Sequence, residues 1–140
     1  MEKKLPSAPE VGVGAIVIKD SKILLVKRNK NPKKGQWAIP GGSVKLGETL
    51  QQAVEREIKE ETGLVVQARD PIYTFDFIER DDRDQIRFHY VIIDLAADLI
   101  GGKLHPSDDA EDARWFAPEE IQDPGVTETT RLLLKKIRFI

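Results

Sequence analysis

Glu57, Glu60 and Glu61 are three acidic residues in a stretch whose periodicity predicts one amphipathic helix from about residue 49 to residue 63. At about 100° per residue, Glu57 and Glu61 are about 40° apart, and both lie within about 20° of Leu50 on the face expected to be buried. Glu60 lies at the edge of the same arc. Carboxylates on a buried face are costly unless their charge is neutralised. Because hard oxygen ligands suit Mg²⁺ or Mn²⁺, the spacing predicts a divalent-cation site; a solvated charged face is the alternative.

A longer pattern surrounds these acids, with the form Gly-x5-Glu-x7-Arg-Glu-U-x-Glu-Glu-x-Gly-U, where U is a bulky apolar residue. Its fixed positions are filled by Gly42, Glu48, Arg56, Glu57, Ile58, Glu60, Glu61, Gly63 and Leu64. This pattern resembles the Nudix box. The approach through Trp37 to Gly42 and the strand at residues 114–116 after an acidic loop are also similar to that family. We therefore identify the chain as Nudix-like, and we expect residues 1–140 to form a single domain, with residues 1–10 as a loose lead-in.

The resemblance implies roles for residues in and around the box. It makes Glu57 and Glu61 the principal metal ligands, with Glu60 assisting and the backbone carbonyl of Gly41 as a further ligand. Three glycines, at positions 41, 42 and 47, allow the backbone angles that a tight loop requires.

Other roles follow from the same resemblance. Glu48 and Arg56 are expected to pair as a brace for the loop before the helix. Arg28, at the end of a predicted strand, resembles a phosphate-contacting arginine, with a surface ion pair as the alternative. The general base is expected to be Asp109, which lies in the acidic loop formed by Asp108, Asp109, Glu111 and Asp112, with Glu57 as the rival.

The activity implied by the resemblance is divalent-cation-dependent hydrolysis of a nucleoside diphosphate linked to another group. The strand around residues 88–90, the double glycine at 101–102 and the loop at 108–109 resemble Nudix-like proteins labelled ADP-ribose pyrophosphatases. We therefore expect ADP-ribose or a related nucleoside diphosphate sugar as the substrate. One alternative is a MutT-like hydrolase of nucleoside triphosphates, including oxidised forms. Another is a non-catalytic nucleotide sensor, although such domains commonly lack one or more of the box acids.

The elements that must position these residues are interleaved strands and helices. The resemblance implies an α/β class of fold, an α/β/α sandwich around a mixed sheet, and the hairpin-length turn between the first strands also favours a mixed sheet. A second amphipathic helix is expected at residues 127–136, with Leu132, Leu133 and Ile137 on its inner side. We expect strands at residues 11–18, 23–26, 36–39, 64–67, 72–78, 86–95 and 114–116, and a short helix at residues 118–121. Trp37 is expected to pack in the core, with stacking on a base as the alternative, and His89 is expected to be structural rather than catalytic.

Composition limits the function classes. The chain has 140 residues, a formal net charge of -2 and no cysteine. The charge argues against a dedicated nucleic-acid or membrane binder, and the absence of cysteine excludes disulfides and thiol catalysis. With no apolar signal segment, we expect a cytoplasmic protein whose partner is a small-molecule nucleotide. The family resemblance leaves a homodimer open.

Overall fold

The computed structural model describes residues 5–107, 109–121 and 125–140. Residues 5–9 have no regular structure, as expected for a lead-in. The elements, in chain order, are β1 (Glu10–Ile16), β2 (Ile18–Lys19), β3 (Lys22–Arg28), β4 (Trp37–Ala38), β5 (Gly41–Ser43), α1 (Leu50–Thr62), β6 (Leu64–Arg80), β7 (Ile86–Gly102), β8 (Ala110–Phe116), the 3-10 turn η1 (Pro118–Glu120) and α2 (Glu128–Lys136).

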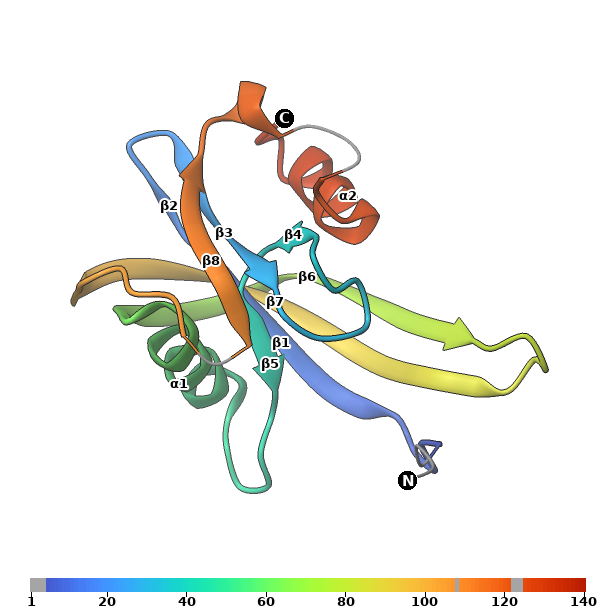
Figure 1. Ribbon diagram of the computed structural model, residues 1–140. Helices are drawn as coiled ribbons and strands as arrows, with labels where there is room; N and C mark the ends of the chain where they lie inside the picture. Colours follow the sequence, from blue (N-terminus) through green and yellow to red (C-terminus); the bar gives the residue numbers. More distant parts are fainter. Residues whose placement is uncertain (1–4, 108, 122–124) are drawn as a thin grey trace.

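The strands form two sheets. One has the order β5-β1-β7-β6, in which β1 and β7 are parallel and the other neighbours are antiparallel. The other has the order β2-β3-β4, with β8 also paired to β3. A mixed sheet was predicted, and it is confirmed. The long β6–β7 hairpin extends well past the helices (Figure 1).

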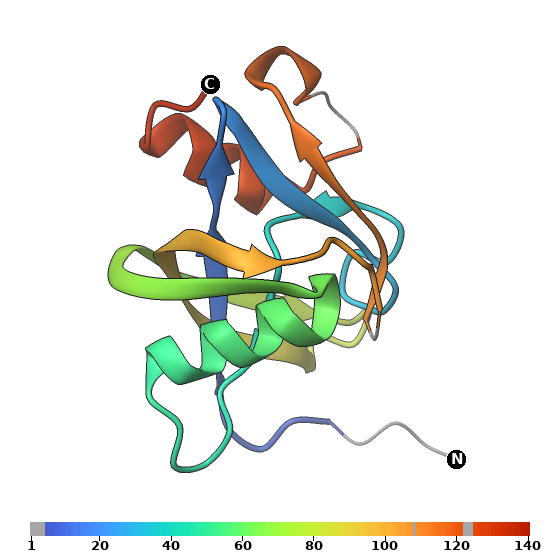
Figure 2. The ribbon, with the colours of Figure 1, turned by 90° about the vertical axis from the view of Figure 1, so that its left-hand side faces the viewer.

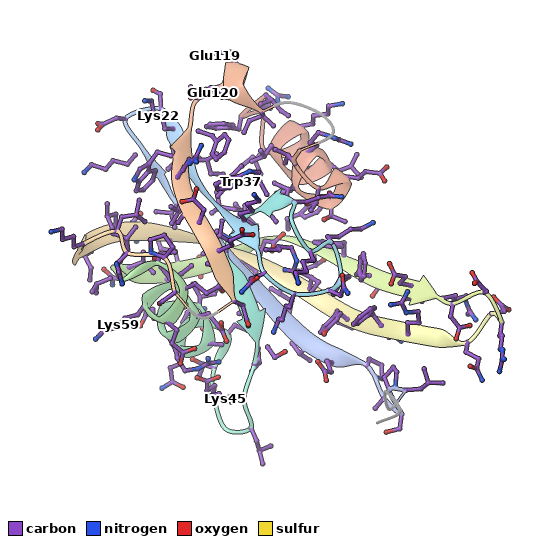
Figure 3. The ribbon with its side chains drawn as sticks, in the orientation of Figure 1. Lys22, Trp37, Lys45, Lys59, Glu119 and Glu120 are labelled. Atoms are coloured by element: carbon purple, nitrogen blue, oxygen red, sulfur yellow. The ribbon has the colours of Figure 1, made fainter. Side chains whose placement is uncertain are left out.

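The two helices lie on opposite sides of the strands (Figure 2), and an apolar cluster lies under each helix. Alternation along β3 shows the division: Leu24 and Val26 join the cluster under α1, whereas Ile23 and Leu25 join the cluster under α2. The layers are therefore helix, strands and helix, and the expected α/β/α class is confirmed. Trp37 lies between the strands and α2 (Figure 3) and packs in that second cluster, with its ring 5.0 Å from that of Phe116.

Helix α1 begins and ends where the sequence predicts. The Thr49 side chain accepts a hydrogen bond from the Gln52 amide, and the Gln52 side chain accepts one from the Thr49 amide. These reciprocal bonds satisfy two amides that the first turn would otherwise leave unpaired. Gly63 ends the helix with a φ of 76°, a left-handed conformation that glycine adopts without strain.

Several predicted element boundaries are wrong. The strand expected at residues 36–39 is only Trp37–Ala38, and Gly41–Ser43 form a further strand, β5, because β1 supplies an antiparallel partner. Two separate strands were expected between residues 64 and 78, yet β6 is continuous through Pro71, where shifts in register accommodate a residue without an amide hydrogen. Strand β7 continues beyond its predicted end at residue 95 to Gly102, because β6 pairs with it there. A short helix was predicted at residues 118–121, and residues 118–120 form a 3-10 turn.

The buried face of α2 differs from the predicted one. Leu132 is 50% exposed, while Leu133 and Leu134 are buried and Ile137 packs against the second cluster. Thr130 is also buried, so the inward arc runs through residues 130, 133, 134 and 137. Leu132 lies about 200° from Leu134 around the helix and therefore points away from the strands. Neither helix of the described residues is long and apolar enough to cross a membrane.

Candidate functional site

Glu61 is the most deeply buried acid of the box. Its side chain faces the Gly41–Gly42 turn from α1, only 4% of its surface is exposed, and Oε1 accepts a hydrogen bond of 3.1 Å from the Gly41 amide. Burial, and then the neighbouring charge of Glu57, raise the pKa of Glu61 to about 8. One amide donor does not offset these effects, so a cation placed beside this carboxyl would lower its pKa.

Glu57 lies one turn earlier on α1 and contacts the same glycine turn. A Cβ atom on Gly42 would overlap the Glu57 carboxyl group, so a side chain at position 42 would displace that carboxyl from its present place. Glu57 Oε1 accepts a hydrogen bond of 2.7 Å from Arg56 Nη1. Glu60 is more exposed, and its Oε2 lies 3.3 Å from the same Arg56 nitrogen.

Glu57, Glu60 and Glu61 lie along one arc of α1, but their carboxyl groups are not arranged around one point. Within residues 5–107, 109–121 and 125–140, no three His, Cys, Asp or Glu side chains are grouped as they would be around a metal ion. Arg56 draws Glu57 and Glu60 towards itself, whereas Glu61 turns towards the Gly41 amide. The donor set nevertheless fits a hard divalent cation, because it offers carboxylate oxygens, one of them buried with a raised pKa.

The Gly41 backbone is placed to add a carbonyl oxygen. Gly41 is opposite Gly14 in the β1–β5 pair, and the flanking pairs carry the inter-strand hydrogen bonds, such as that from Ala15 N to Pro40 O at 2.9 Å. Its amide points away from β1 to Glu61, and the carbonyl of a strand residue lies on the same edge as its amide. The expected backbone ligand therefore faces the α1 acids.

Glu48 and Arg56 join the loop before α1 to the third turn of the helix. Arg56 Nε and Nη2 donate to the two Glu48 oxygens at 2.6 and 2.9 Å, and Nη2 also donates to the Ser43 carbonyl at 2.9 Å. The bidentate pair lowers the pKa of Glu48 to about 2. This is the geometry that a brace requires.

Arg28 and Asp109 both interact electrostatically with Glu61. Arg28 ends β3, its Nε donates to the Pro32 carbonyl at 2.6 Å, and burial lowers its pKa while the charge of Glu61 opposes that change. Asp109 forms an ion pair of 2.8 Å with Lys30, and both side chains are more than half exposed. The structure therefore does not bring Asp109 into hydrogen-bond contact with the box acids. Asp112 pairs with Arg114 instead, and Asp108 lies outside the described residues.

A cleft connects Arg28 and the glycine turn to the face of the sheet under α2. It encloses roughly 930 Å³ when its solvent-open mouth is included. Sequence reasoning missed most of its floor, which comes from alternate residues of three strands: Gly12, Gly14, Phe75, Phe77, Tyr90, Ile92 and Asp94. A signal was present, because glycines alternate along β1 and one acid interrupts an apolar strand.

The comparisons with known proteins agree with this geometry. The model of the NUDIX domain family matches residues 8–137. An ADP-ribose pyrophosphatase of Methanocaldococcus jannaschii is 46% identical over 108 residues, which are 77% of this chain and 62% of that protein. The match thus spans less than two thirds of the archaeal relative.

Solved structures share the fold. A MutT NUDIX hydrolase from Burkholderia pseudomallei is 31% identical, with a TM-score of 0.75 over 94% of this chain and 99% of that one. A bifunctional NMN adenylyltransferase/ADP ribose pyrophosphatase from Francisella tularensis, complexed with AMP and a manganese ion, is 25% identical with a TM-score of 0.69, over 94% of this chain and 41% of that one. Because the family model covers almost the whole sequence and includes the complete box, this chain belongs to the NUDIX domain family.

Proposed function

We propose that the chain hydrolyses the phosphoanhydride bond of a nucleoside diphosphate linked to another group, with ADP-ribose or a related nucleoside diphosphate sugar as the substrate. The observation that carries this proposal is the placement of Glu57 and Glu61 against the Gly41–Gly42 turn, at the edge of a cleft that also contains Arg28. Glu61 and Arg28 also interact electrostatically, so an acid and a basic group lie near one another, as a diphosphate with its counter-cation requires.

Glu57 and Glu61 are the proposed principal metal ligands, with Glu60 and the Gly41 carbonyl as further donors. A divalent cation bound there, Mg²⁺ or Mn²⁺, would neutralise diphosphate oxygens and lower the pKa of a coordinated water. Arg28 would hold a phosphate oxygen through its planar guanidinium, whose position the Pro32 carbonyl fixes.

Proton removal from the attacking water is assigned to Asp109, with Glu57 as the alternative. Water adds to one phosphorus while the other phosphate departs, so ADP-ribose would give AMP and ribose 5-phosphate. Glu48 and Arg56 act as the brace and touch no reacting atom.

The name of the archaeal relative supports ADP-ribose, and the manganese ion and AMP in the Francisella tularensis structure support a metal-dependent nucleotide site. The family match over residues 8–137 supports the expected single domain. A cytoplasmic location and a homodimer stay predictions.

The test is hydrolysis of a substrate panel that contains ADP-ribose, other nucleoside diphosphate sugars and nucleoside triphosphates, each with Mg²⁺, with Mn²⁺ and with chelator. We expect ADP-ribose to yield AMP only when a metal ion is present. Glu61→Gln should lower kcat by at least about 100-fold, because it removes one charged ligand of the cation. Glu111→Gln is the matched control, since Glu111 is exposed on β8.

Other outcomes have definite meanings. Cleavage that survives chelation contradicts the metal-dependent mechanism. Cleavage of triphosphates with no cleavage of ADP-ribose assigns the chain to the MutT-like alternative. Tight nucleotide binding with no turnover on the whole panel assigns it to the sensing alternative.

A further inference from the structure

A ladder of side chains crosses the cleft floor on one face of β6 and β7. The members are cross-strand neighbours in the antiparallel register, so they project from the same face of the sheet. The pairs, from the open end inwards, are Phe77 with Tyr90, Phe75 with Ile92, and Tyr73 with Asp94. The ladder is aromatic and apolar until it ends at a single carboxyl group.

Two glycines of β1 keep this floor open. Gly12 and Gly14 are the parallel partners of Ile92 and Asp94, so their missing side chains belong to the same face. A Cβ on Gly12 would lie 2.8 Å from Ile92 Cδ1, and a Cβ on Gly14 would overlap Asp94 Oδ1. The Asp94 carboxyl therefore occupies the space that a side chain at position 14 would fill.

Asp94 is an unusual buried acid. Only 1% of the surface of Asp94 is exposed, and neither of its carboxyl oxygens has a hydrogen-bond partner among the described residues. Desolvation raises the pKa of Asp94 to about 7. Buried polar groups are normally paired, and leaving one unpaired destabilises the folded protein, so an unpaired carboxyl that lines a cleft indicates a missing partner.

We propose that Asp94 is the base-recognition residue of the cleft, where its carboxyl group binds the amino edge of adenine. This inference rests on the proposed function, because it assumes that the cleft binds a nucleotide. One Asp94 oxygen accepts a hydrogen bond from the 6-amino group, and the protonated form also donates to the adjacent ring nitrogen.

The neutral form of the carboxyl distinguishes adenine from guanine. A protonated carboxyl offers one donor and one acceptor, which match the amino group and ring nitrogen of adenine, whereas a carboxylate offers only acceptors, which match the two N–H donors of guanine. The apolar neighbours Ile39 and Ile92 favour the neutral form.

The rest of the cleft fits the other parts of a nucleotide. The flat faces of Phe75 and Phe77 are suited to the base, and Arg28, Gly41 and Gly42 line the same cleft where the phosphates would lie. Ile39 is partly exposed and lies over Gly14, so an entering base would contact it beside Asp94. The base end and the phosphate end are thus parts of one continuous cavity.

The experiment is a double-mutant cycle between Asp94 and the 6-amino group. The dissociation constants of AMP and of purine riboside 5′-monophosphate, which lacks only that amino group, are measured by calorimetry for the wild type and for Asp94→Leu. We expect the wild type to prefer AMP by about tenfold and Asp94→Leu to lose this preference. Asp94→Asn, which keeps one acceptor and one donor, should retain it.

The controls keep the two proposals separate. Asp76→Leu changes an exposed acid of β6 and should keep the tenfold preference. GMP and IMP, which differ in the 2-amino group, test guanine in the same way. For each variant, the ratio of the two dissociation constants does not depend on the fraction of protein that is folded. It is also measured without turnover.

An equal preference for AMP in the wild type and Asp94→Leu would overturn the assignment of Asp94. A dependence on Asp94 seen only with the GMP and IMP pair would overturn the choice of adenine. Failure to hydrolyse ADP-ribose would contradict the proposed function but leave the binding result intact.

Discussion

Two buried carboxyl groups, Glu61 and Asp94, stand out at the scale of single residues. They lie on opposite faces of the same sheet, Glu61 towards α1 and Asp94 towards α2. Burial raises both pKa values, to about 8 and about 7 respectively. Glu61 has one backbone donor, from Gly41, whereas Asp94 has no partner among the described residues. Each is costly to the folded protein alone, which is why each is assigned to a bound species.

Asp109 gives a prediction at this scale. Asp109→Asn should lower kcat by roughly 100-fold or more with little change in KM, because a general base acts on the reacting water and contributes little to binding the substrate. Steady-state kinetics with ADP-ribose measure both constants.

The ion pair with Lys30 provides the control. Lys30→Met removes the 2.8 Å contact but keeps the carboxylate, so it should leave kcat within a few-fold of the wild type. An equal loss of kcat in Lys30→Met would mean that the pair only positions the loop. Unchanged turnover in Asp109→Asn would remove Asp109 from the mechanism.

At the scale of elements, α1 and the loop before it act as one unit. Thr49 and Gln52 cap the helix, and Arg56 binds the loop acid Glu48 and the Ser43 carbonyl. Arg56 also contacts Glu57, so one side chain connects the loop, the helix and a proposed ligand. The loop and the acids therefore keep a fixed relation to each other.

Arg56→Lys tests this unit. Lysine keeps the charge but cannot form the bidentate pair, so we expect the free energy of unfolding to fall by roughly 1–3 kcal/mol and kcat to fall with it. Denaturant unfolding and ADP-ribose kinetics measure the two effects.

Arg69→Lys is the matched control. Arg69 pairs with Asp98 on the surface, where both side chains are about half exposed, so little change in stability is expected. If both variants lost the same stability, the brace would be no more than another surface ion pair.

At the scale of the whole molecule, the cleft crosses from one layer to the other. Its floor lies on the α2 face of β6, β7 and β1, and it reaches the α1 acids only at the Gly41–Gly42 turn. The glycines allow this passage, because a Cβ on Gly41 would overlap the Val13 carbonyl and one on Gly42 would overlap Glu57. The sheet thus separates the proposed base-recognition residue from the proposed metal ligands.

Asp94 also predicts how global stability depends on pH. Its pKa is about 7 in the folded state against 3.8 for an unperturbed aspartate, so the folded state binds the proton more tightly. Between these two values the unfolded chain is ionised while the folded chain stays protonated, and stability therefore falls as pH rises from about 4 to about 7.

Asp94→Asn removes this dependence. Between pH 4.5 and pH 8, we expect the melting temperature of the nucleotide-free wild type to fall relative to that of Asp94→Asn. The difference should be about 4 °C for each kcal/mol of unfolding free energy that the wild type loses. Thermal unfolding by circular dichroism measures the difference, and Asp76→Asn should follow the wild type. Parallel curves for wild type and Asp94→Asn would show that Asp94 ionises normally.

Local elements were predictable to different degrees. The bounds of α1 depend on capping residues within one turn, and these bounds were predicted correctly. Strands β5, β6 and β7 were predicted too short or missed, since Gly41, Pro71 and Gly102 discourage a strand locally and only a partner strand stabilises them there. The inner face of α2 was partly wrong because its apolar residues are contiguous and leave the phase to tertiary contacts.

The sequence by itself determined the box, the order of its acids along α1 and the family to which the chain belongs, because helical phase and a fixed motif are local properties. Only the tertiary structure decided that Arg56 is shared among Glu48, Glu57 and Glu60, and that Asp109 pairs with Lys30. It alone showed Asp94 as an unpartnered carboxyl at the end of an aromatic ladder. The physical reason is that burial and pairing depend on which strands become neighbours, and residues far apart in the chain set that arrangement together.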